Sequence, residues 1–111
     1  MMITEDLSIV KELFSILDQG IVDGYEAFQY EVKVGEGWVE TQLTAERNGI
    51  EITDVETDFN NAVIFKLVKQ LRQSAAQRGD HWTAFTLSYR RGGQVKTFFS
   101  YDQSNSPDSQ V

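Results

Sequence analysis

The sequence predicts an α+β domain in which an antiparallel sheet of about five strands carries two helices on one face. Apolar residues recur every three or four positions in two segments, 5–20 and 57–78, as in amphipathic helices. Elsewhere apolar and polar residues alternate, as in half-buried strands. Short glycine-containing turns join these strands and give the order α-β-β-β-α-β-β. We expect a single domain over residues 1–102, followed by a flexible polar tail over 103–111.

The first helix is expected to have Thr4 as its N-cap and to end at Gly20. Its apolar stripe consists of Leu7, Val10, Phe14, Leu17 and Ile21. The segment from Phe28 to Val34 alternates with period two, which predicts the first strand. The turn "GEG" at 35–37 leads to a second strand over 38–45, and the Asn-Gly pair in "ERNG" predicts a tight hairpin to a third strand over 50–53.

The second helix has two alternative starts in the sequence. Thr57 or Asp58 would cap one start, whereas Thr53 and Glu56 would form a capping box four residues earlier. Basic residues gather toward its end, and Gly79 is expected to stop it. The buried side is expected to consist of Phe59, Val63, Ile64, Leu67, Val68, Leu71 and Ala75.

The aromatic stretch over residues 80–102 predicts a second hairpin whose register can be derived from its pattern. A two-residue turn at the glycine pair would place Phe85 opposite Ser100, which mixes apolar and polar residues on one face. A three-residue loop over 91–93 makes one face apolar throughout, so we expect that loop. Its pairs are Tyr89 with Val95, Leu87 with Thr97, Phe85 with Phe99, and Thr83 with Tyr101. We expect Trp82, Phe85, Leu87, Phe99 and Tyr101 to be mostly buried.

Charge is distributed unevenly along the chain. Residues 1–60 contain 14 acidic and 3 basic residues, a net charge of −11, whereas residues 61–111 contain 3 acidic and 7 basic residues, a net charge of +4. An acidic half of this kind argues against a nucleic-acid partner, because such proteins neutralise phosphates with basic residues. It favours a basic protein partner. The alternative is that the charge serves only solubility.

The expected compartment is the cytoplasm. The chain has no cysteine, which excludes a disulfide scaffold, thiol catalysis and a cysteine-based zinc site. Acidic residues stand near the start, where a signal peptide would carry basic ones. No segment approaches the roughly 18 apolar residues of a membrane span.

The sequence predicts no enzyme, no cofactor and no metal site. His81 would need an orienting acid and a nucleophile for catalysis, and its neighbour Asp80 would point to the other face of a strand. Ser88 and Ser100 are expected on the polar faces of ordinary strands, without a glycine elbow. One histidine with scattered carboxylates does not specify a metal site. The aromatic alternation could stack nucleic-acid bases, but it is more typical of a core.

The second hairpin also follows a known family pattern. The matching residues are Trp82, Thr83, Leu87, Tyr89, Gly93, Val95, Lys96, Phe99 and Tyr101. In these positions the chain resembles the YezG-like immunity proteins, bacterial antitoxins of contact-dependent growth inhibition and other polymorphic toxin systems. The helix ending in "LVKQLRQ" and the early strand pair also fit, so the resemblance covers residues 5–102 and is strongest over 82–101.

The resemblance implies a protein that binds and neutralises a cognate toxin, commonly a nuclease domain, by occluding it. The charge agrees, because a nuclease must be basic to hold nucleic acid, and an acidic partner can imitate the phosphates. We expect a monomer when free and a one-to-one complex with the toxin. An acidic type III secretion chaperone is the alternative: it shares the element order but forms homodimers and usually has a third helix, for which residues 103–111 are unsuited. A third possibility is a small-ligand pocket between helices and sheet, but the sequence shows no convergent polar groups for it.

Two acidic stretches are the expected partner-binding residues. The first, "EGWVE", contains Glu36, Trp38 and Glu40, and the second, "EITDVETD", contains Glu51, Asp54, Glu56 and Asp58. Tryptophan is a favoured hot-spot residue when it is exposed. Two alternatives stay open: Trp38 could be buried on the sheet, and the acids before the second helix could serve as its caps.

Overall fold

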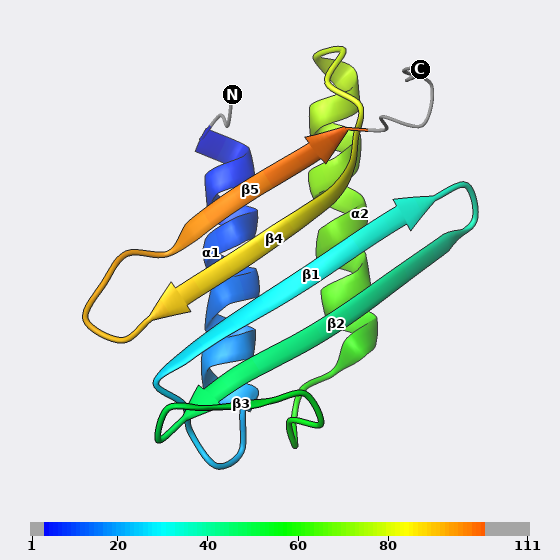
Figure 1. Ribbon diagram of the computed structural model, residues 1–111. Helices are drawn as coiled ribbons and strands as arrows, with labels where there is room; N and C mark the ends of the chain where they lie inside the picture. The colour runs from blue at the N-terminus through cyan, green and yellow to red at the C-terminus, as the bar shows by residue number, and fades with distance from the viewer. Residues whose placement is uncertain (1–3, 102–111) are drawn as a thin grey trace, which may run out of the picture.

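A computed structural model describes residues 4–101 and confirms the α+β class and the element order. The helices are α1 (Thr4–Gly20) and α2 (Asn61–Gln77). The strands are β1 (Ala27–Gly35), β2 (Trp38–Arg47), β3 (Ile50–Ile52), β4 (Trp82–Arg90) and β5 (Lys96–Tyr101). They form one antiparallel sheet in the order β3-β2-β1-β4-β5, and both helices cover the same face of it (Figure 1). The expected tail over 103–111 lies outside the described residues. No described helix is long and apolar enough to cross a membrane.

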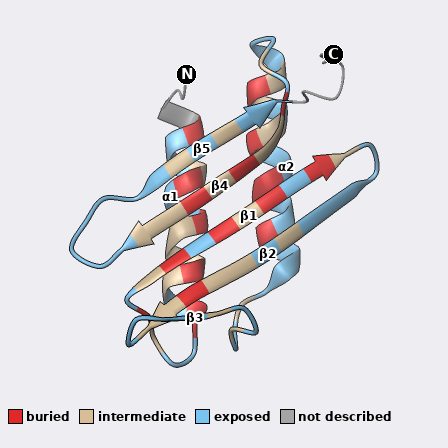
Figure 2. Ribbon diagram, viewed as in Figure 1, coloured by how far each residue is buried: buried red, intermediate tan, exposed pale blue. Residues whose placement is uncertain are grey.

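The core lies between the helices and the sheet. On β1 and β4 the buried residues alternate with more exposed ones, and on the helices they face the sheet (Figure 2). The largest side chains that are fully buried are Trp82, Phe85, Leu13 and Leu17. Trp82, Phe85 and Phe99 pack ring against ring, with centroids 5.3 to 5.9 Å apart. Burial of this aromatic group joins the second hairpin to the helices.

The buried stripe of α1 differs from the expected one. Leu13 and Leu17 are fully buried, whereas Leu7 is 42% exposed. At 100° per residue, Leu7 lies about 100° around the helix from the midpoint of those two leucines, so it cannot face the sheet. Asp6 occupies the stripe instead. The helix includes Thr4, the expected N-cap, whose side chain lies outside the described part of the chain, and the expected end at Gly20 is confirmed.

Asp6 joins the beginning of α1 to the end of α2. It is only 2% exposed, and its Oδ2 accepts a hydrogen bond from Nη2 of Arg78 at 2.7 Å. Arg78 is the C-cap residue of α2. Removing Arg78 would leave the buried carboxylate of Asp6 without this partner, so the ion pair connects the beginning of α1 to the end of α2.

The first three strands form the expected meander. β1 pairs with β2 in one continuous register from Ala27–Glu46 to Gly35–Trp38, without a bulge. The expected Asn-Gly hairpin is confirmed: Asn48 and Gly49 have φ of 55° and 75°, as a tight hairpin turn requires. β2 extends two residues beyond its expected end at 45, and β3 stops at Ile52, one residue early.

Neither expected start of α2 is correct. The N-cap is Asn60, whose side chain accepts a hydrogen bond from the backbone N–H of Ala62. Residues 56–58 are held extended, because Thr57 forms a β-bridge with Ile21 and the N–H of Asp58 donates to the carbonyl of Gly20. Helical geometry can begin only after this contact. The expected stop at Gly79 is confirmed, with φ of 80° and hydrogen bonds back into the last turn.

The buried side of α2 is largely as expected. Val63 is the exception, since it is 40% exposed, and Phe59 precedes the helix and is partly buried. The confirmed buried residues are Ile64, Leu67, Val68, Leu71 and Ala75.

In the second hairpin the expected strand pairs are correct in the middle and wrong at both ends. Phe85 pairs with Phe99 and Leu87 with Thr97, as expected. The connection spans residues 91–95 rather than three residues, so Tyr89 and Val95 are not a strand pair. The register shifts between Trp82 and Ala84, which places Tyr101 opposite Trp82 instead of Thr83. Trp82, Phe85 and Leu87 are buried and Phe99 is partly buried.

Tyr101 is 43% exposed, so the expectation that it belongs to the core is wrong. It ends β5, an edge strand that has a neighbour on one side only. Its hydroxyl donates a hydrogen bond to Oδ1 of Asp80, which raises the pKa of Tyr101.

Candidate partner-binding face

The face of the sheet opposite the helices is open (Figure 1). Its side chains follow from the register, because residues that pair across strands point to the same face and alternate with the core residues. They are Trp38, Glu40, Gln42, Thr44 and Glu46 on β2; Gln29, Glu31 and Lys33 on β1; Ala84, Thr86, Ser88 and Arg90 on β4; Lys96, Phe98 and Ser100 on β5; and Glu51 on β3. The β2–β3 side carries acids, and the β4–β5 side carries bases.

Trp38 is held on this face in an exposed position. Its side chain lies over Gly35, its partner across the hairpin, because a Cβ atom added to Gly35 would lie 2.3 Å from Cε2 of the indole. Trp38 is nevertheless 52% exposed, so it is not buried on the sheet. A glycine beneath it allows the ring to pack against the sheet while its other face stays in solvent. This arrangement suits an aromatic anchor for a partner.

The acidic residues expected to bind a partner are all exposed. Glu36 lies in the β1–β2 turn and Glu40 on β2, while Asp54, Glu56 and Asp58 lie between β3 and α2. None of them forms a salt bridge with another residue in the range 4–101. Capping of α2 does not explain them, because Asn60 is the cap and the first turn of α2 contains no acid. These carboxylates are therefore available to a basic partner.

The structure separates the two acidic stretches rather than combining them. Glu51 pairs with Glu46, six positions along β2 from Glu40. At about 3.3 Å per residue, the two groups lie about 20 Å apart, one near each end of β2. Glu40 and Glu51 lie on the strands at this edge of the sheet, whereas Asp54, Glu56 and Asp58 lie in the connection after β3, which is bonded to the end of α1. The sequence could not show this, because it contains no information about which strand lies at the edge.

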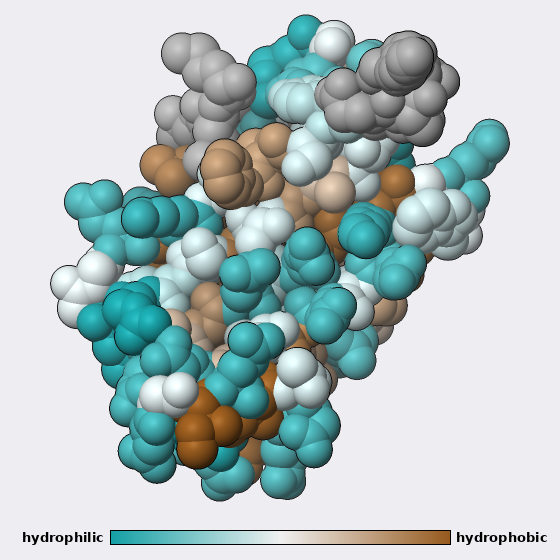
Figure 3. All heavy atoms as spheres, viewed as in Figure 1, coloured by the Kyte–Doolittle hydropathy of each residue, from teal (hydrophilic) through white to brown (hydrophobic). Residues whose placement is uncertain are grey.

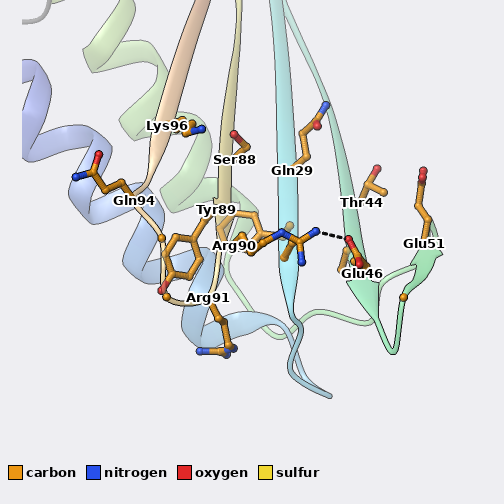
Figure 4. A pocket seen from close by; sticks show the side chains of 16 residues that line it. Gln29, Thr44, Glu46, Glu51, Ser88, Tyr89, Arg90, Arg91, Gln94 and Lys96 are labelled. Carbon is orange, nitrogen blue, oxygen red and sulfur yellow. Dashed lines mark hydrogen bonds and ion pairs between the residues drawn. The ribbon is translucent and has the colours of Figure 1, made fainter.

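A wide hollow of about 960 Å³ lies on the open face near the β2–β3 and β4–β5 connections (Figure 4). Glu46 and Glu51 lie on one side, and Arg90, Lys96 and the loop after β4 on the other. Gln29 and Ser88 lie between them, and Thr44 lies on the acidic side, beside Glu46 on β2. Nη2 of Arg90 lies 2.7 Å from Oε1 of Glu46, so an ion pair crosses the hollow. The sequence pattern does not indicate this site, since its residues come from five strands and two connections.

Arg91 fixes the loop that borders this hollow. Its backbone N–H donates to the carbonyl of Glu26, and its Nε donates to the carbonyl of Tyr25 at 2.7 Å. Its guanidinium also lies 4.2 Å from the centre of the Tyr25 ring. Tyr25 in turn donates a hydrogen bond to Asp18, and burial together with this bond raises the pKa of Tyr25. The loop is thereby attached to the end of α1 and the beginning of β1.

The exposed apolar residues are dispersed among polar ones. The open face is mainly hydrophilic, with separate apolar patches (Figure 3). Phe98 is 78% exposed and Ile50 is 64% exposed. Sequence analysis did not single out Phe98, although Phe98 and Phe99 are adjacent on a strand and one of them must face away from the core.

The residues considered for catalysis are not brought together. His81 is exposed and precedes β4, and Asp80 bonds to Tyr101 instead. Ser88 and Ser100 lie on the open face of regular strands, as expected. Among the described residues, no group of three or more histidine, aspartate or glutamate side chains could hold a metal ion.

No protein-family model matches this chain, and no curated protein matches it.

Proposed function

We propose that the protein is an immunity protein that acts in the cytoplasm by binding and neutralising a bacterial toxin, most suitably a nuclease domain. The observation that carries the proposal is the set of exposed acids on β2, on β3 and in the connections next to these strands that form no salt bridge within residues 4–101, together with an exposed and positioned Trp38. A tryptophan anchor surrounded by charges is a common composition of a protein-binding surface.

Charge supports a basic partner of this kind. A nuclease domain must present cations to the phosphates of its substrate, and carboxylates on a partner can occupy the same cations. Complementary charge also raises the association rate, which matters for an inhibitor that must act before the toxin does. The resemblance of the second hairpin to the YezG-like immunity proteins supports the same function.

The proposal can be tested with the toxin domain encoded in the neighbouring reading frame. That domain is expressed in cells with and without this chain, and the two purified proteins are mixed and analysed by size-exclusion chromatography with light scattering. We expect the chain to restore growth, to be a monomer alone and to form a one-to-one complex with the toxin. A stable homodimer that binds an unfolded secreted segment and gives no protection would support the chaperone alternative instead.

A further inference from the structure

The β2 strand has a free edge along most of its length. β3 pairs only with Ala45, Glu46 and Arg47, and no other described strand pairs with β2 on that side. The Gly35–Trp38 pair closes a two-residue turn, so the backbone groups of Trp38 and every second residue after it bond to β1. The backbone N–H and C=O groups of Val39, Thr41 and Leu43 therefore point away from the sheet without a strand partner among the described residues.

The path of the chain after β3 leaves this edge of β2 unpaired. A longer β3 would cover the edge, but the chain bends away at residues 53–54. Beyond the bend, the N–H of Val22 donates to the carbonyl of Glu56, and Thr57 forms its bridge with Ile21. The connection is thereby attached to the end of α1 and cannot easily move back beside β2.

We propose that this edge, from Trp38 to Leu43, accepts a β-strand of the toxin, which extends the sheet in line with β3. The inference rests on the proposed function and specifies how the partner is recognised. A strand in this position passes between the two acidic stretches, so it explains how groups about 20 Å apart can act on one partner.

The side chains of β2 define the chemistry of the incoming strand. Residues opposite Val39, Thr41 and Leu43 would lie on the helix side, where Val39 is 38% exposed and Leu43 packs against the core, so apolar side chains suit them. The residue opposite Glu40 would lie on the open face and should be lysine or arginine. The strand is therefore expected to alternate apolar and basic or polar residues.

The edge of β5 is less suitable than the edge of β2 for adding a strand, and a second copy of this chain is a less suitable partner than a toxin strand. The β5 edge belongs to a hairpin with a register shift at Trp82–Ala84 and has Lys96 at one end, whereas β2 has a continuous register and acids at both ends. Bulges and inserted charges are common means of protecting an edge from pairing. A second copy of this chain would bring one acidic β2 edge against another, which charge repulsion disfavours.

The test uses the neighbouring toxin domain, inactivated by substitution in its own active site, and amide hydrogen exchange of this chain. In the free protein the amides of Val39, Thr41 and Leu43 should exchange rapidly. In the complex they should become protected, while the outward amides of Thr97 and Phe99 on β5 should continue to exchange. A complex that leaves the three β2 amides unprotected would overturn the strand-addition inference and leave the proposed function standing.

A pair of proline variants provides an independent test. Val39→Pro removes one outward N–H of β2 without removing a bond to β1, and Thr97→Pro removes the equivalent group on β5. Thermal unfolding shows whether both variants are folded. We expect Val39→Pro to weaken toxin binding at least tenfold and Thr97→Pro to change it less than threefold. Equal binding by both variants would contradict the inference, as would a loss restricted to Thr97→Pro, whereas failure of the wild-type chain to bind any neighbouring toxin would refute the proposed function itself.

Discussion

Reversing Asp54, Glu56 and Asp58 to lysine should abolish protection from the toxin while the protein stays folded. The three side chains are exposed and form no salt bridge within residues 4–101, and surface substitutions of this kind usually change stability by less than about 0.5 kcal/mol each. Each reversal adds two charges, so the triple variant shifts the net charge from −7 to −1 and reduces self-repulsion. The thermal midpoint should therefore change by only a few degrees.

The effect on binding depends on whether these acids touch the toxin. At about 10 Å in water, two unit charges interact by about 0.4 kcal/mol, which physiological salt reduces to about 0.1 kcal/mol. Three reversals at that distance would weaken binding only a few-fold. Close charge pairs across an interface instead couple by about 1.5 to 7 kcal/mol each, so three contacts would weaken binding more than about a thousandfold. We expect the larger loss.

The assay is growth of toxin-expressing cells, together with the dissociation constant measured at several salt concentrations. Reversal of Lys66, Lys69 and Arg72 on α2 to glutamate should preserve protection. Glu12→Lys provides a control with the same sign of charge change as a single Asp54→Lys, since Glu12 is also exposed, on α1. If the acidic triple variant still protects cells and its binding keeps the wild-type salt dependence, the phosphate-mimic explanation is wrong.

Three further predictions concern the fold and the position of Trp38. Asn60→Ala should destabilise the protein by about 1 kcal/mol in denaturant titration, whereas Asp58→Ala should be nearly neutral; the reverse order would contradict the assigned cap. Gly35→Val should displace the Trp38 indole, which tryptophan fluorescence would detect. The free energy of toxin binding should change more than the free energy of unfolding. Unchanged fluorescence would contradict the packing of the indole over Gly35. Because the pKa of Tyr25 is raised in the folded protein, its contribution to stability is intact below about pH 10 and is lost at higher pH. In Tyr25→Phe the free energy of unfolding should therefore fall less steeply as the pH rises above about 10. An unchanged slope of that free energy against pH would contradict this.

Local patterns predicted the elements of this fold well, because periodicity and turn residues act over a few positions. The alternation in β1 and the Asn48-Gly49 turn are examples. The errors arose where a distant contact decides the outcome. α2 begins late because Thr57 is bridged to Ile21, which is far away in the sequence. Tyr101 is exposed because β5 is an edge strand, a property of the strand order rather than of the local pattern.

The candidate site was predicted less completely than the fold. The exposed acids could be identified from composition and spacing, whereas the sequence left open whether Trp38 is exposed or buried on the sheet. The positions of these residues around β2 could not be predicted, since they depend on β3 being short and on the chain bending away after Ile52. The hollow with the Arg90–Glu46 ion pair was also not predicted. It depends on strands β1 and β4 being neighbours, which follows only from the order of the sheet.

The sheet order also determines what the chain exposes while the ribosome is still making it. β1 lies at the centre, between β2, which follows it directly, and β4, which is synthesised only after the whole of α2. Until then one edge of β1, a strand rich in aromatic and β-branched residues, has no partner strand, and such an exposed edge invites aggregation. The residues made by that stage, 1–81, contain 15 acidic and 7 basic residues, a net charge of −8, and would repel neighbouring nascent copies. Three further basic residues, Arg90, Arg91 and Lys96, arrive only with the strands that close the sheet, so the negative charge of the chain is larger while the sheet is incomplete than when it is finished.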